Sequence, residues 1–102
     1  MFVLQEILRV RNTRQSEAVK RLNWIHGLMQ PQPGFEWATV SRYLGNPTDY
    51  LILRAWESGD AYNAYLESPQ SAEYRQGNRR GLYKTISTEC YEVVDEVRPT
   101  GQ

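Results

Sequence analysis

The sequence has few of the residues that build covalent or metal-based frameworks. Its 102 residues include one cysteine, Cys90, and one histidine, His26. A lone cysteine cannot form an internal disulfide, which fits a reducing compartment. A lone histidine without a cysteine or carboxylate cluster predicts no metal site. No apolar run approaches the ~20 residues of a membrane span, and the opening residues show no signal-peptide pattern. We therefore expect a cytoplasmic protein with neither a membrane nor a metal partner.

An excess of charge of one sign is also missing. Twelve Lys and Arg balance twelve Asp and Glu, so the formal net charge is zero. Nucleic acids and anionic membranes bind surfaces with concentrated positive charge, so no nucleic-acid partner is expected. Basic clusters do occur, within residues 9–14 and 75–84, and such clusters are usually solvated faces. The length fits one small domain, expected over residues 1–97, followed by a loose tail over 98–102.

Hydropathy patterns predict four strands and two helical regions. Residues 2–10 alternate as a strand whose apolar face also carries Glu6. Apolar residues at spacings of four, three and four predict a helix that ends at Pro31: Ala18, Leu22, Ile25 and Met29. We expect the side chains of Asn12-Thr13 to cap this helix. Strands over 35–44 and 50–57 are predicted to form a hairpin through the turn residues at 45–49.

The rest of the chain is predicted to hold a second helical region and a last strand. Ser58 is expected to cap a second helix, and Ser68-Pro69 to start another helical segment before a last strand at about 85–94. The order β-α-β-β-α-β predicts an α+β, ferredoxin-like protomer with helices on one face of an antiparallel sheet. Its strands are at least half apolar on both faces, so the face without helices needs a cover. A second copy of the chain would supply it, which predicts a homodimer.

Several short motifs resemble one family. They are Met1-Phe2-Val3, Pro33-Gly34-Phe35, Trp56-Glu57-Ser58 and the aromatic helix from Ala61 to Ser68-Pro69. Over residues 1–94 the chain resembles the antibiotic biosynthesis monooxygenase (ABM) family. The resemblance implies a dimeric α/β barrel, in which the sheets of two ferredoxin-like protomers pack together.

The same resemblance implies two chemistries. Some members are cofactor-independent oxygenases of electron-rich polycyclic phenols, and others degrade haem with an Asn, a Trp and an iron-ligating His. These three positions fall here on Glu6, Tyr65 and Arg75. A guanidinium offers hydrogen-bond donors only and cannot ligate iron. The resemblance therefore implies a protein without a cofactor, with a haem-binding relative as the less favoured alternative.

The candidate catalytic residues are Glu6 as general base, with Tyr65 and Arg75 stabilising an anion. An apolar surround disfavours the charged form of a carboxyl group, which would suit Glu6 as a base. The alternative is a structural ion pair with an arginine such as Arg75. Candidate substrate-binding residues are an aromatic set and the histidine: Trp24, His26, Trp37, Trp56, Tyr62 and Tyr74.

Ordinary structural roles stand beside these candidates. The aromatic residues could simply fill the core and a dimer interface. His26 could lie at the edge of the core instead of moving protons or ligating iron in a cavity, and Cys90 is expected to be a small buried apolar residue.

Two functional hypotheses follow. The first is a cofactor-independent monooxygenase acting on a small electron-rich aromatic or quinol-type molecule. The second is a non-catalytic, ligand-binding dimer on the same scaffold. A cavity in which Glu6 and Tyr65 converge would favour the first, and an interior filled by side chains the second.

Overall fold

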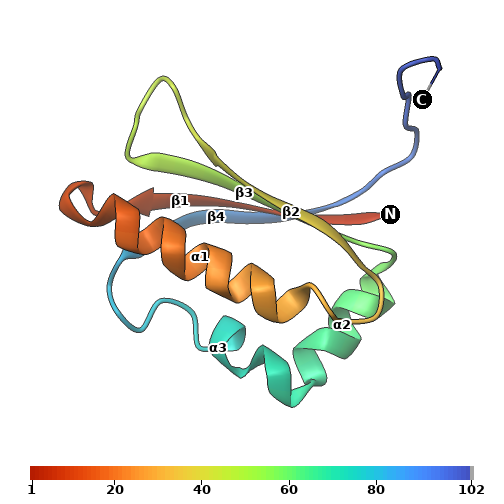
Figure 1. Ribbon diagram of the computed structural model, residues 1–102, viewed down its shortest axis with the longest axis horizontal. Helices are drawn as coiled ribbons and strands as arrows, with labels where there is room; N and C mark the ends of the chain where they lie inside the picture. The colour runs from red at the N-terminus through yellow and green to blue at the C-terminus, as the bar shows by residue number, and fades with distance from the viewer. Residues whose placement is uncertain (102) are drawn as a thin grey trace.

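The computed structural model describes residues 1–101, and Gln102 of the expected tail lies outside the described residues. Seven longer elements follow the predicted order: β1 (Phe2–Val10), α1 (Gln15–Met29), β2 (Phe35–Arg42), β3 (Asp49–Trp56), α2 (Gly59–Glu67), α3 (Ala72–Arg75) and β4 (Tyr83–Glu92). The strands form one antiparallel sheet in the order β2-β3-β1-β4. The helices lie together on one face of this sheet (Figure 1). The α+β, ferredoxin-like fold is thus confirmed.

Of the two predicted helix N-caps, one is confirmed and one is wrong. The Ser58 hydroxyl accepts a hydrogen bond from the backbone N–H of Ala61 at 3.1 Å, so the predicted cap of α2 is confirmed. The predicted cap of α1 by Asn12-Thr13 is wrong. These residues form a 3-10 turn, Asn12–Arg14, that leads into the helix without a side-chain cap.

In the described residues no helix is long and apolar enough to cross a membrane.

The inner face of the sheet, which the helices cover, is built by alternation in β1 and β3. Leu4, Glu6 and Leu8 of β1 lie opposite Arg54, Ile52 and Tyr50 of β3. The apolar members are buried against Ala18 and Leu22 of α1 at one end and against α2 at the other. Two charged residues, Glu6 and Arg54, are therefore neighbours on the inner face, which is otherwise apolar in β1 and β3.

A bulge at the start of β2 changes which aromatic residue faces the helices. Alternation alone predicts Phe35 and Trp37 on one face, but the register shifts between them. Phe35 consequently lies on the inner face, edge-on to Trp56 at 5.2 Å between ring centroids, and Trp37 lies on the outer face. Gly34 precedes the bulge with φ +84°, and a Cβ there would come within 2.6 Å of the Ala61 Cβ, so only glycine fits.

The outer face of the sheet carries apolar residues that no helix among residues 1–101 covers (Figure 1). They come from all four strands: Val3, Ile7, Trp37, Leu51, Leu53 and Tyr91. Cys90 lies on the edge strand β4 and is exposed. The expectation of a buried Cys90 is therefore wrong, because β4 has a neighbouring strand on one side only.

Candidate functional site

The centre of the inner face is an ion pair. Arg54 of β3, which is 2% exposed, pairs through Nη1 with the Glu6 carboxylate of β1. The Arg54 Nε–H donates to Nε2 of His26 on α1 at 2.9 Å. The Arg54 guanidinium thus joins two strands and a helix. The Glu6 carboxylate compensates its positive charge in the space between the sheet and the helices.

The arrangement fixes the protonation state of His26. A guanidinium can only donate, so the nitrogen facing Arg54 is unprotonated and the ring proton is on the other nitrogen. Burial, together with the charge of Arg54, lowers the pKa of His26 from 6.5 to about 4. His26 is therefore neutral at physiological pH. Its ring also borders two hollows of about 550 and 530 Å³ that lie between α1 and β2.

This state can be measured directly, because His26 is the only histidine. In a tag-free chain, the proton NMR signal of the imidazole ring should titrate with a midpoint of about 4. Between pH 6.5 and this midpoint the unfolded chain binds a proton that the folded chain does not, so this group makes stability fall as the pH falls. Arg54→Met should move the midpoint up. A wild-type midpoint near 6.5 would contradict the assignment.

Aromatic side chains surround the pair. The Arg54 guanidinium lies 5.1 Å from the centre of the Tyr74 ring, and the Tyr74 hydroxyl is 2.9 Å from that of Tyr62. The Trp56 ring stacks on Tyr65 at 5.2 Å and lies 5.9 Å from Tyr62. Burial raises the pKa of all three tyrosines, so each hydroxyl keeps its proton and can donate a hydrogen bond.

Two polar atoms in this cluster have no partner. Among the described residues, the buried Tyr65 hydroxyl and the buried Trp56 Nε1–H make no hydrogen bond. A buried polar group without a partner costs about 1–3 kcal/mol, so such groups are uncommon in native interiors. The charges of Arg54 and Arg75 both act on the Tyr65 hydroxyl. The two atoms are therefore unused donors close to a charged centre.

Most of the predicted site residues meet here, and three do not. Glu6, His26, Trp56, Tyr62, Tyr65 and Tyr74 form the cluster. The predicted partner of Glu6 is wrong: Arg75 bonds instead to the Ser71 hydroxyl at 2.8 Å, because α3 directs it along its own turn. Trp24 on α1 is 47% exposed and Trp37 on β2 is 39% exposed, and both lie away from the ion pair.

Sequence reasoning missed Arg54, although a signal existed. Alternation places Arg54 on one face with Tyr50, Ile52 and Trp56, which is an unusual place for a charge. Its partner could be found only through the register that sets Leu4 opposite Arg54, next to Glu6. That register joins residues 48 apart in sequence.

The residues present do not suit a haem-ligating or metal site. Arg75 occupies the position expected for the iron ligand, and the His26 nitrogen that faces inward already accepts a hydrogen bond from Arg54. Within residues 1–101 there is no group of three or more His, Cys, Asp or Glu arranged to hold a metal ion.

Comparisons with known proteins agree with this fold. The sequence model of the family described as antibiotic biosynthesis monooxygenase matches residues 1–77. Among curated proteins, no sequence matches the chain. A solved structure of SnoaB from Streptomyces nogalater (mutant N63A), described as a cofactor-independent oxygenase, is similar with a TM-score of 0.82 and 16% identity, over 96% of this chain and 97% of that one. MhuD from Mycobacterium tuberculosis, described as a haem degrader, is similar with a TM-score of 0.76 and 22% identity, over 96% of this chain and 100% of that one. At these identities the likeness extends to the fold alone.

Proposed function

Because the chain belongs to the antibiotic biosynthesis monooxygenase family, we propose that it is a monooxygenase that needs no cofactor and oxidises a small electron-rich aromatic or quinol-type substrate. The observation that carries the proposal is the pair of unused donors, Tyr65 O–H and Trp56 N–H, in the cluster around the ion pair of buried Arg54 with half-buried Glu6. Donors held in a water-poor interior are what an anionic reaction intermediate needs.

The absence of a cofactor restricts the substrate. Conversion of an activated ring CH₂ to C=O by O₂ gives one molecule of water, and the substrate supplies all four electrons. Such a substrate must first lose a proton to become a carbanion or phenolate that O₂ can oxidise. The protein then has to provide a base, donors for the anion and exclusion of water.

Glu6 can serve as the base because the positive charge of Arg54 has a negative partner both before and after the proton transfer. Before proton transfer the carboxylate is paired with Arg54. After the transfer Glu6 is neutral, and the new substrate anion becomes the counter-charge of Arg54. The Tyr65 hydroxyl and the Trp56 N–H would donate to the anion's oxygen, with Tyr62 and Tyr74 as walls. The cavity expected where Glu6 and Tyr65 converge is not among the hollows beside α1, and Tyr74 covers Arg54, so Tyr74 has to move to admit a substrate.

Oxygen consumption tests this proposal. Purified chain without added metal, flavin or haem is mixed with anthrones, phenols and hydroquinones, with spontaneous oxidation subtracted. We expect uptake of O₂ with at least one class, and with ¹⁸O₂ one labelled oxygen in the product and the other in water. Tight binding of these compounds without O₂ uptake would instead support a non-catalytic, ligand-binding dimer.

The assembly is part of the same proposal: two copies pack through their outer sheet faces. Apolar residues from all four strands lie on that face, and a chain of this size buries too little surface for a large core of its own. In sedimentation at micromolar concentration we expect twice the 11.9 kDa mass of one chain.

A matched pair of variants locates the interface. Leu53 is half-buried on the outer face, and Leu28 is half-buried on α1, on the other side of the sheet. Leu53→Lys should give a folded monomer, because it places a charge inside an apolar interface. Leu28→Lys should stay dimeric. A monomeric wild-type chain, or equal behaviour of the two variants, would contradict this packing.

A further inference from the structure

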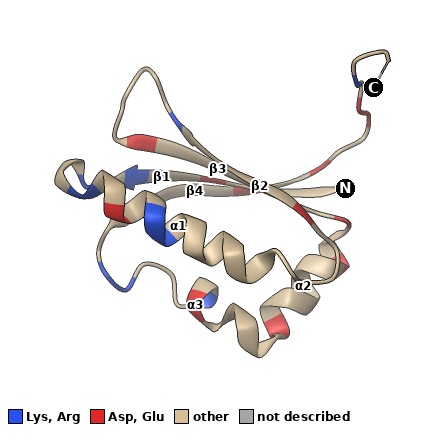
Figure 2. Cartoon of the chain, in the orientation of Figure 1, with Lys and Arg blue, Asp and Glu red and all other residues tan. Residues whose placement is uncertain are grey.

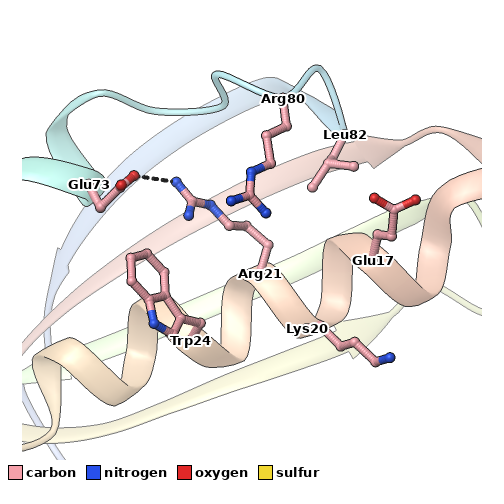
Figure 3. Close-up of a pocket in the computed structure, with 7 residues that line it drawn as sticks. All are labelled: Glu17, Lys20, Arg21, Trp24, Glu73, Arg80 and Leu82. Atoms are coloured by element: carbon pink, nitrogen blue, oxygen red, sulfur yellow. Dashed lines mark hydrogen bonds and ion pairs between the residues drawn. The ribbon is translucent and has the colours of Figure 1, made fainter.

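A separate hollow of about 460 Å³ lies between α1 and the segment that joins α3 to β4. Its volume is in the range of small-molecule sites. The close-up in Figure 3 shows Trp24 and Arg21 rising from α1, with Arg80 and Leu82 entering from the opposite segment. Glu6, Arg54 and Tyr65 are not among its lining residues.

The carboxylates around the hollow are already neutralised. Glu73 binds Arg21 at 2.6 Å and Arg79 at 2.9 Å, and Glu17 binds Arg14 at 2.8 Å. Each has at least one arginine, so neither leaves a negative charge uncompensated. Figure 2 shows that the charged residues of α1 are confined to its first half, which faces a basic stretch of the opposite segment.

In the part of the chain that the structure describes, the Arg80 guanidinium has no carboxylate bonded to it, and Glu17, the lining carboxylate on which its charge acts, is already bonded to Arg14. Among residues 1–101 Arg80 makes no ion pair or side-chain hydrogen bond, and it points toward Arg21 (Figure 3). Lys20, by contrast, points away from the other side chains of the hollow (Figure 3). Arg21 and Arg79 share one carboxylate, Glu73, and Arg80 pairs directly with none, which leaves excess positive charge between α1 and the opposite segment.

An aromatic surface adjoins this charge. The Arg21 guanidinium lies 4.9 Å from the centre of the Trp24 ring, which is 47% exposed. Leu82 adds a buried apolar side chain to the lining. A flat ring could therefore lie against Trp24 with an acidic group directed at the two arginines.

We propose that this hollow binds an aromatic acid, with the carboxylate between Arg80 and Arg21 and the ring against Trp24. The ligand's carboxylate would supply the directly bonded counter-charge that Arg80 lacks, and a guanidinium fork suits a carboxylate's two oxygens. This binding proposal depends only on the residues that line the hollow, and it does not require the chain to be an oxygenase.

The hollow also lies near the inner cluster. Glu73 lines it, and the next residue, Tyr74, covers Arg54. The charges of Glu6, Arg54 and Arg21 all act on the Tyr83 hydroxyl. An acidic substituent held in the hollow could orient a substrate toward Glu6, and this extension alone rests on the proposed function.

Binding is tested with 2-naphthoate and its neutral analogue 2-naphthamide, by calorimetry and by NMR of the Trp indole N–H signals. The Trp24 signal is identified by its loss in Trp24→Phe. We expect naphthoate to bind and shift this signal, and Arg80→Gln to weaken binding by about 10- to 100-fold. The matched control, Lys84→Gln, removes the same charge from exposed β4 and should change the affinity less than about twofold.

Equal affinity for naphthoate and naphthamide would overturn the proposal, as would an unchanged affinity in folded Arg80→Gln or a Trp24 signal that does not move. Arg80→Lys, which keeps the charge and loses the fork, should bind with intermediate affinity. The binding test does not depend on turnover, so its result is separate from that of the oxygen-consumption assay. A chain that binds naphthoate but consumes no O₂ supports the binding site and counts against the oxygenase. An active oxygenase that fails to bind naphthoate overturns the site alone.

Discussion

Replacing Arg54 by methionine is expected to lower the free energy of unfolding by about 3–5 kcal/mol. The change leaves the Glu6 carboxylate without its counter-charge on a largely apolar face, and it removes the donor to His26. For a domain of about 100 residues this corresponds to a fall in Tm of more than about 10 °C. Thermal or urea unfolding followed by circular dichroism measures the effect.

A second arginine pair in the same sheet is the control. Arg9 of β1 binds Asp49 of β3 at 2.9 Å, but the Arg9 side chain is 55% exposed. Arg9→Met should therefore leave the unfolding transition nearly unchanged. Removing both halves of the buried pair, in Glu6→Gln with Arg54→Met, should recover part of the loss, because no lone buried charge remains. Equal losses in Arg54→Met and Arg9→Met would show that the inner pair contributes little.

The Glu6→Gln variant is expected to reduce turnover by about 10²–10⁴-fold, the usual effect of losing a general base. Glutamine keeps the shape and can accept a hydrogen bond from Arg54, but it cannot take a proton from the substrate. The variant also loses the counter-charge of Arg54, so kcat has to be compared on folded protein below the Tm of both forms.

The matched control is Asp49→Asn, the same change from carboxylate to amide in the exposed pair with Arg9. It should leave turnover unchanged. Glu6→Asp, which keeps a carboxylate on a shorter side chain, should retain more activity than Glu6→Gln. A folded Glu6→Gln variant with full turnover would remove Glu6 as the base and leave it a structural partner of Arg54.

The sequence by itself determined the order of elements and the family. Alternation in residues 2–10, the turn residues at 45–49 and the Ser58 cap each depend on neighbours along the chain. Such local patterns follow from backbone geometry, in which side chains repeat with a period of 2 in strands and 3.6 in helices. They are therefore readable before any tertiary contact is known, and together they led to the ferredoxin-like fold.

Only the tertiary structure decided which residues of the candidate site contact one another. The register of β1 against β3 selected Arg54 as the partner of Glu6, and the direction of α3 turned Arg75 toward Ser71 instead. The bulge in β2 put Trp37 outside and Phe35 inside. Each outcome depends on which strand or helix lies beside another, and a shift of one residue in a strand turns its side chains to the opposite face. No spacing along the chain contains that choice, because it is made by packing between segments far apart in sequence.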